Sequence, residues 1–333
     1  MTIDYRTEIK TVGIVGCGVI GAGWAARCLA RGLDVVASDP VPGAEERLRA
    51  AVDNAWPALT RLGLWPGAER GRLSFEADLA TVAARADFLQ ESAPEREDLK
   101  RRLLAEIDRH APPDVVIGSS TSYLMPSRLQ ADCAQPERLV VGHPFNPVYL
   151  LPLVEVVGGE RTDPDALAAA QRIYAGLGMH PLLVRKEIDG FIADRLMEAV
   201  FRESLHLLDQ DVASTGEIDE AIIYGFGLRW AFMGVFMTFH LAGGDQGMRH
   251  FLEQFGPSLK MPYCRMEAPE LSGELIDKIV TGCELQAAGG SVKELERLRN
   301  DCLISIMQAL QAYEVGAGQV LAREDAKRGR AEA

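Results

Sequence analysis

The sequence lacks any apolar run approaching the roughly 20 residues needed to cross a bilayer, although 47% of its 333 residues are hydrophobic. Its first ten residues are polar and contain no apolar signal core. We therefore expect a cytoplasmic protein with no membrane partner, long enough for two domains.

Cysteine is scarce and scattered along the chain. No two of the six cysteines form a CxxC pair, and none lies near a histidine at metal-ligand spacing. This pattern argues against a disulfide framework and a bound metal, and it favours reduced, buried thiols.

Positive charge is also in deficit, because 35 Lys and Arg stand against 48 Asp and Glu, for a formal net charge of −13. Such a chain should repel nucleic acid and anionic membranes, so we expect neither as a partner. The charge also indicates weakly that the small-molecule substrate is not a large polyanion, an indication that a local basic patch would override.

Short apolar runs alternate with amphipathic stretches in the first half of the chain. Strand patterns lie at residues 12–15, 33–38, 88–90, 115–118, 139–142, 153–157 and 182–184. Helical spacing fills most of the intervals, and residues 44–62 suggest an excursion of one or two helices. This alternation predicts an α/β fold with a doubly wound, mostly parallel sheet.

After about residue 186, long helical periods dominate. They cover residues 191–210, 215–224, 244–255, 271–283 and 292–321. We expect a first domain over residues 1–186, an all-helical domain over 187–325, and a charged, frayed tail over 326–333.

Three glycines with GxGxxG spacing follow the first strand and open the first helix. Gly16 would allow the tight turn, Gly18 would let a pyrophosphate approach the backbone, and Gly21 would let the helix pack on the strand. The anion would then bind at the helix N-terminus, beside Val19 and Ile20. In this context the loop predicts a Rossmann-type dinucleotide site.

The next strand ends at Asp39, 18 residues past Gly21. An acid at this position accepts hydrogen bonds from the adenosine ribose and repels a 2′-phosphate, so the expected cofactor is NAD. A chance glycine loop followed by a surface aspartate is the alternative explanation.

Three polar residues lie in or next to later strands. Glu155 falls inside an apolar strand, where a charge is costly unless paired, and His143, twelve residues earlier, is its natural partner. Glu155 would hold one imidazole nitrogen while the other takes a hydroxyl proton, and Ser122 would bond the reacting oxygen. Taken singly, His143 is as well explained as a loop cap, Glu155 as a contact between strands and Ser122 as part of a polar turn. Together the three residues favour catalysis.

These stretches resemble the 3-hydroxyacyl-CoA dehydrogenase family from about residue 11 to 247. The matching segments are 16–21, Glu91 with Glu95 and Lys100, 119–122, 143–147, 153–156 and 190–195. The resemblance implies that His143 is the general base, Glu155 its orienting partner, and Ser122 a substrate and nicotinamide contact. It also implies that Glu91 and Lys100 line the cofactor cleft, and that the helical domain dimerises.

Asp194 departs from the family pattern, which usually has Asn at this position. Asn can donate to a substrate oxygen, whereas an ionised Asp only accepts. A carboxylate at this position would instead favour a cationic substrate or tune the ionisation of His143.

Six aromatic residues fall within residues 224–239, in a chain that is only 7% aromatic. Arg229 suits bidentate capture of a carboxylate, and Trp230 suits a quaternary ammonium through cation–π attraction. A helix core or subunit interface is the alternative, and we favour it for Phe236 and Phe239.

The aromatic segment resembles the carnitine and gulonate dehydrogenase branches of the family, and residues 145–152 and 242–256 resemble the carnitine branch. This resemblance implies carnitine, a 3-hydroxy acid with a trimethylammonium group, as substrate. We include Tyr123, Phe145 and Asp194 among the candidate substrate contacts. The expected activity is NAD-dependent oxidation of the 3-hydroxyl by a homodimer. L-gulonate or 3-hydroxyacyl-CoA oxidation, and a non-catalytic NAD-binding structural protein or sensor, are the alternatives.

Overall fold

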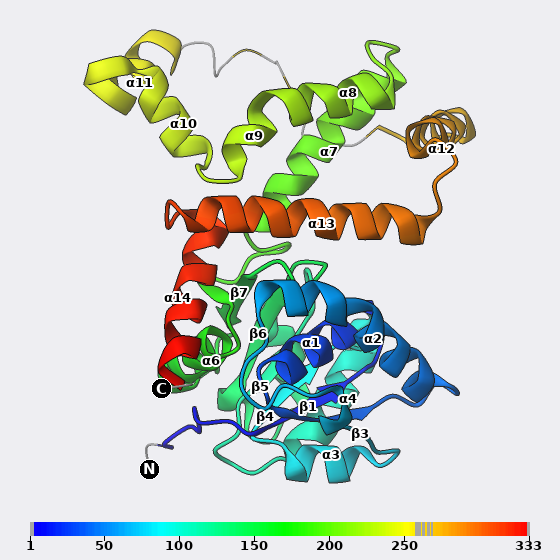
Figure 1. Cartoon of the computed structure of the whole chain (residues 1–333), viewed down its shortest axis with the longest axis vertical. Helices are drawn as coiled ribbons and strands as arrows, with labels where there is room; N and C mark the ends of the chain where they lie inside the picture. The colour runs from blue at the N-terminus through cyan, green and yellow to red at the C-terminus, as the bar shows by residue number, and fades with distance from the viewer. Residues whose placement is uncertain (1–2, 257–260, 262–263, 265–266, 268, 332–333) are drawn as a thin grey trace. The chain divides into compact units, whose positions relative to one another are not determined.

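The computed structural model describes residues 3–256, 261, 264, 267 and 269–331. The chain forms two compact units, a sheet unit of Met1–Ile192 with Val320–Ala333 and a helical unit of Ala193–Gln319. The division falls close to the expected boundary at residue 186, but the last helix belongs with the first unit (Figure 1).

The sheet unit is built on eight strands in the order β3-β2-β1-β4-β5-β6-β7-β8. They are β1 Thr11–Val15, β2 Asp34–Ser38, β3 Leu73–Phe75, β4 Phe88–Glu91, β5 Ile117–Ser119, β6 Leu139–Pro144, β7 Leu153–Gly158 and β8 His180–Val184. Neighbouring strands run parallel except β6 and β7, which are antiparallel. The doubly wound, mostly parallel sheet is therefore confirmed, with β3 as an unexpected strand.

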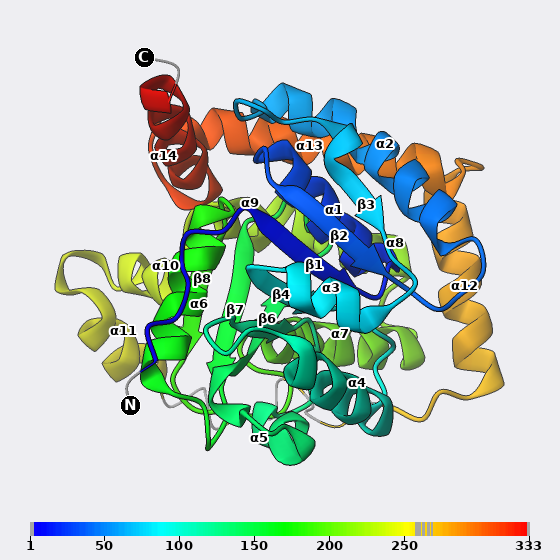
Figure 2. The same cartoon turned by 90° about the horizontal axis from the view of Figure 1, so that it is seen from below.

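Helices cover both faces of the sheet (Figure 2). They are α1 Val19–Ala30, α2 Ala44–Leu62, α3 Leu79–Arg85, α4 Glu97–His110, α5 Pro126–Leu129 and α6 Pro164–Gly176, with 3₁₀ turns at Arg70–Arg72, Gln130–Asp132 and Pro136–Arg138. One apolar core includes Trp24, Leu48 and Ile173 from α1, α2 and α6. The other includes Leu104 and Leu129 from α4 and α5. Since the parallel strands point the same way, their carboxyl ends gather at one edge, where ligands bind in such folds.

Arg27 on α1 is a buried cation that joins this helix to two other parts of the sheet unit. Its guanidinium donates to the backbone carbonyl oxygens of Val148, Leu151, Leu177 and Gly178. Burial lowers its pKa to about 10, so it is still protonated at neutral pH. Arg27 thereby holds the loop after β6 and the carboxyl end of α6 against the helix that begins at the glycine loop.

The helical unit contains only helices among its described regular elements. They are α7 Ala193–Asp209, α8 Thr215–Ala221, a π-helix at Ile222–Phe226, α9 Gly227–Trp230, α10 Val235–Ala242, a 3₁₀ turn at Gly244–Gln246, α11 Gly247–Phe255, α12 Gly273–Ala287 and α13 Val292–Gln311. The expectation of an all-helical second domain is confirmed.

The helix expected over residues 292–321 is interrupted. Glu314 and Gly316 have φ of 50° and 52°, which ends α13 and turns the chain into α14, Gly316–Ala331. The expected frayed tail is also wrong as far as Ala331, because α14 is anchored: Arg328 donates to the Leu62 carbonyl at 3.1 Å, and Glu324 pairs with Arg31. Residues 332 and 333 lie outside the described residues.

Over the described ranges, no single helix is both long and apolar enough to span a membrane. One pair of helices, Thr215–Trp230 and Val235–Ala242, meets that test of length and composition only when its 88° bend is ignored. Of the cysteines, those at 17, 28 and 133 are buried as expected, whereas those at 264, 283 and 302 are exposed.

Candidate active site

The glycine loop has the geometry that a bound dinucleotide requires. Gly16 has φ of 92°, a conformation that a residue with a side chain rarely adopts. A Cβ on Gly21 would lie 1.9 Å from the Gly16 carbonyl oxygen, so only glycine lets α1 start this close to β1. A Cβ on Gly18 would meet no described atom within 4 Å, which leaves its backbone open to a pyrophosphate. Val19 is 71% exposed beside it, and Ile20 is half-buried.

Asp39 lies directly after β2, next to the glycine loop. Its Oδ2 accepts a hydrogen bond from the Cys17 backbone N–H at 2.8 Å, and its Oδ1 accepts one from Val41 N–H at 2.9 Å. Burial, reinforced by the Asp39 charge, raises the pKa of the Cys17 thiol to about 12, so this thiol stays neutral. The loop therefore presents a fixed acid where a ribose would bind.

His143 and Glu155 are directly opposite each other on the antiparallel strands β6 and β7. His143 Nδ1 lies 2.9 Å from Glu155 Oε2, and the two residues are 4% and 0% exposed. Glu155 Oε1 accepts a second hydrogen bond, from the Ile192 backbone N–H at 2.9 Å. The structure thus brings together the two residues that the sequence pairs, with the carboxylate fixed at both oxygens.

Two phenylalanine rings flank the imidazole. The centroid of Phe145 lies 5.0 Å from that of His143, and Phe191 approaches at 5.7 Å. Phe145 is half-buried and therefore partly accessible at the site, whereas Phe191 is buried. This places Phe145 next to the proposed base, as a substrate contact would have to be.

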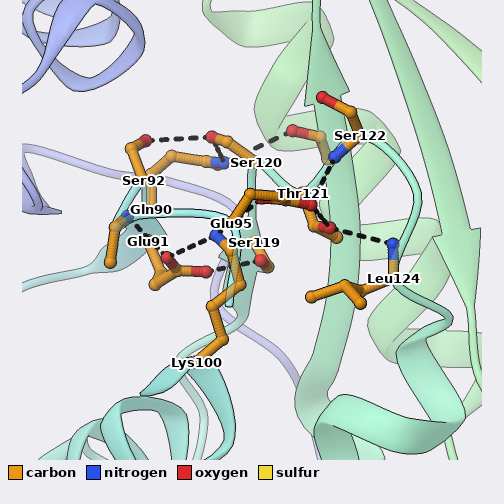
Figure 3. A network of polar contacts seen from close by, with 12 residues as sticks. Gln90, Glu91, Ser92, Glu95, Lys100, Ser119, Ser120, Thr121, Ser122 and Leu124 are labelled. Carbon is orange, nitrogen blue, oxygen red and sulfur yellow. Dashed lines mark hydrogen bonds and ion pairs between the residues drawn. The ribbon is translucent and has the colours of Figure 1, made fainter. Parts of the chain in front are cut away.

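A polar network lies under the edge formed by the ends of β4 and β5 (Figure 3). Lys100 on α4 pairs with Glu91 at 2.8 Å and with Glu95 at 3.4 Å. Glu91 and Lys100 are 0% and 1% exposed, so they support the edge from within the protein instead of lining an open cleft. Ser119 also donates to Glu91, which satisfies the buried carboxylate.

Ser122 is held at this edge by Glu95. One oxygen of Glu95 accepts hydrogen bonds from the Ser122 backbone N–H at 3.1 Å and from the Thr121 hydroxyl (Figure 3). Tyr123 follows with 49% of its surface exposed. The turn after β5 is therefore tied to Glu95 through the Ser122 backbone and the Thr121 side chain.

A second buried network lies behind the first. Gln90 donates to Ser120 Oγ at 2.7 Å and accepts from the Tyr174 hydroxyl at 2.6 Å. Trp24 of α1 also donates to Ser120 Oγ, at 3.2 Å. A Cβ on Gly142 would lie 1.7 Å from the Tyr174 oxygen, so the residue before His143 has room only for hydrogen. These contacts join the cofactor helix to the strands that carry the site.

The remaining candidates belong to the helical unit. Asp194 lies in the first turn of α7 and is half-buried. Arg229 and Trp230 lie on α9, where Trp230 is 43% exposed and packs on Phe226 with ring centroids 4.5 Å apart. Trp230 also lines a cavity of about 830 Å³, whose walls come mainly from apolar residues of α7, α8 and α12.

The positions that hold these side chains in place were not expected from the sequence. Glu95 appeared only as a matching residue, although an acid four residues after Glu91 and five before Lys100 was a usable signal. Arg27, Gln90 and Ile192 gave no signal, because their contacts are with backbone groups or with residues distant in sequence.

Two family models match nearly the whole chain up to residue 278. The NAD-binding domain of 3-hydroxyacyl-CoA dehydrogenase matches residues 11–188, and the C-terminal domain of the same enzyme matches residues 190–278. The two models meet at residues 188–190, near the division between the two units.

Several L-carnitine dehydrogenases are similar over almost their full length. The Pseudomonas aeruginosa protein is 58% identical over 95% of this chain and 98% of its own length. The Bacillus cereus protein is 55% identical over 94% and 96%, and the Mesorhizobium japonicum protein is 49% identical over 93% and 86%.

Solved structures show the same fold. An NAD⁺-dependent dismutase, 5-formyl-3-hydroxy-2-methylpyridine 4-carboxylic acid 5-dehydrogenase, has a TM-score of 0.77 at 28% identity, covering 91% of this chain and 99% of its own. The (S)-3-hydroxybutyryl-CoA dehydrogenase of Ralstonia eutropha has a TM-score of 0.61 at 27% identity, covering 83% and 95%. With the glycine loop, Asp39 and the family match in agreement, the chain belongs to the 3-hydroxyacyl-CoA dehydrogenase family and is an NAD-dependent 3-hydroxy acid dehydrogenase.

Proposed function

We propose that this protein oxidises the 3-hydroxyl of L-carnitine to give 3-dehydrocarnitine. The observation that carries the chemistry is the buried His143–Glu155 pair on adjacent strands of the dinucleotide-binding unit. The substrate is supported by the similarity to L-carnitine dehydrogenases over nearly the whole chain.

His143 is the general base in this proposal. Glu155 holds Nδ1, which sets the orientation of the ring and directs Nε2 to take the hydroxyl proton. The carboxylate also stabilises the imidazolium that forms when the proton is taken, because opposite charges 2.9 Å apart attract strongly in a buried site. NAD⁺, when bound, accepts the hydride released from the substrate carbon.

Ser122 donates a hydrogen bond to the reacting oxygen, from a turn that Glu95 fixes. Phe145, beside the imidazole, and Tyr123 provide apolar contact with the substrate. From the helical unit, Arg229 binds the substrate carboxylate, and Trp230 and Asp194 favour its trimethylammonium group. The last three assignments rest on side-chain chemistry.

A substrate comparison tests the proposal. The purified protein is incubated with NAD⁺ and, separately, L-carnitine, L-gulonate, 3-hydroxybutyrate and a 3-hydroxyacyl-CoA, and NADH absorbance is recorded. We expect kcat/KM to be highest for L-carnitine and to fall when NADP⁺ replaces NAD⁺, since Asp39 repels a 2′-phosphate. Faster turnover of gulonate or the acyl-CoA would show that carnitine is not the preferred substrate. The proposed role of His143 as the base would be unaffected.

We also propose that the protein is a homodimer. The helical unit exposes large apolar side chains such as Leu196, Phe201, Tyr224 and Phe236, more than a monomer usually leaves in water. Sedimentation equilibrium at micromolar concentration should give twice the mass of one chain, and a monomer at that concentration would rule the dimer out.

A further inference from the structure

Glu155 needs two anchors to serve His143 as the proposed function requires. The carboxylate is 0% exposed, and a single bond to the imidazole would leave it able to rotate about its side-chain torsions. The second anchor is the Ile192 N–H, 2.9 Å from Oε1. With a donor on each oxygen, the plane of the carboxylate is set, and the direction of the imidazole is set with it.

The second donor comes from a short segment with an unusual backbone. Gly190 and Phe191 have φ of 70° and 47°, so two successive residues are left-handed, and the second carries a large side chain. Phe191 N–H closes the turn on the Ile188 carbonyl at 3.1 Å. A residue with a side chain is strained in the left-handed region, so the surroundings must hold Phe191 in it.

Burial of the ring supplies that restraint. Phe191 is 1% exposed and belongs to the apolar core that includes Val141, Val157 and Val184. Burial of a phenylalanine ring is among the larger apolar contributions that one side chain makes to stability, and it offsets the backbone strain. The same ring lies 5.7 Å from the imidazole of His143, at an interplanar angle of 50°.

We infer that Phe191 is a positioning residue for the His143–Glu155 pair. Its left-handed backbone directs the Ile192 N–H at Glu155, and its buried ring keeps that conformation in place while packing against the imidazole. One residue thus acts on both members of the pair. The inference rests on the proposed role of His143 as base.

Three variants of the full-length protein test this role. Phe191→Ala removes the ring and keeps the cost of the left-handed backbone, whereas Phe191→Gly removes the ring and the cost together. Ile107→Ala is the matched control, because Ile107 is 0% exposed in the same apolar core but lies near the end of α4, away from the pair. Thermal melts show that each variant is folded before kcat, KM and the His143 Nδ1 proton resonance are measured.

We expect Phe191→Ala to lower kcat by up to roughly 100-fold, since small misplacements of reacting groups have effects of that size. KM for NAD⁺ should stay unchanged, and the Nδ1 proton resonance should shift or broaden. Phe191→Gly should change the resonance less and lose less activity than Phe191→Ala, while Ile107→Ala should lose stability alone. Equal losses in the alanine and glycine variants, or the same change of resonance in Ile107→Ala, would overturn the inference.

Amide exchange, measured first on the parent protein, covers the case in which the Phe191 variants do not fold. The Ile192 amide should exchange slowly with solvent, and its exchange should accelerate in Glu155→Ala, which removes the acceptor. Unprotected exchange in the parent protein would sink the inference. His143→Asn separates the two proposals: if it retains turnover, the proposed base is wrong, whereas if it is inactive and Phe191→Ala behaves like Ile107→Ala, only the role of Phe191 is wrong.

Discussion

The candidate residues of the sheet unit and those of the helical unit differ in how they are held. His143, Glu155 and Lys100 are at most 4% exposed, and each has a charged or polar partner fixed by strand register or by a neighbouring helix. Trp230 is 43% exposed on a four-residue helix that follows a break at Gly225. Under the proposed function, the reacting groups are therefore buried and hydrogen-bonded, whereas the groups that select the substrate include more exposed ones such as Trp230.

This difference suits a family in which the same oxidation is carried out on different substrates. Proton transfer and hydride transfer need atoms placed to a fraction of an ångström, which buried hydrogen-bonded pairs provide. Under the proposed assignments, a change of side chains on helices such as α9 would alter which acid is recognised. We therefore expect substitutions in the two units to affect different kinetic constants.

The largest effect should follow from His143→Ala in the sheet unit. Loss of the base should lower kcat by roughly 10²- to 10⁴-fold, the usual contribution of a positioned general base. NADH binding, followed by fluorescence titration, should be unchanged, because His143 is outside the glycine loop. His180→Ala is the control, since His180 is an exposed histidine at the start of β8.

Unchanged turnover in His143→Ala would refute the mechanism and remove the main contrast between the two units. A joint loss of turnover and NADH binding would mean instead that the fold of the sheet edge had changed.

The stability of the sheet unit should depend more on Arg27 than on any of the exposed arginines of that unit. Arg27→Met leaves four carbonyl groups without this donor. Each unpaired buried group lowers the free energy of unfolding by about 1–3 kcal/mol. Part of this loss is offset, because the variant has no cation to remove from water on folding. We expect a net loss of about 2–4 kcal/mol in urea unfolding. Arg49→Met, which breaks a surface pair with Glu45, should lose less than about 1 kcal/mol. Similar losses in both would mean that Arg27 is not a structural anchor.

The sheet unit was also easier to predict from the sequence than the helical unit. Most strands of the sheet, the glycine loop, Asp39 and the His143–Glu155 pair were predictable, because strands buried in a sheet are apolar along their length and a charge inside one needs a partner. The strand Leu73–Phe75 was missed because three residues give no alternation to detect. The break between α13 and α14 was missed although Gly316 marked it, because apolar helical spacing continues across it.

Contacts with backbone groups could not be predicted. Arg27 reads as a surface arginine on a helix, and only the fold brings the carbonyls of Val148 and Leu177 to it. The Ile192 N–H carries no sequence signal at all, since every residue except proline has one. Positioning groups of this kind become visible only when the three-dimensional arrangement is known.

The smallest effect should follow from changes to Trp230 in the helical unit. Cation–π attraction to a desolvated quaternary ammonium is worth about 1–2 kcal/mol, so Trp230→Ala should raise KM for L-carnitine roughly 5- to 30-fold, with kcat and KM for NAD⁺ nearly unchanged. Trp230→Phe should recover part of the loss, and Tyr313→Ala, which removes an exposed aromatic ring elsewhere in this unit, should have no effect. If Trp230→Ala lowers kcat and leaves KM for L-carnitine unchanged, the helical unit contributes to the chemistry itself, and the assignment of recognition to one unit and reaction to the other fails.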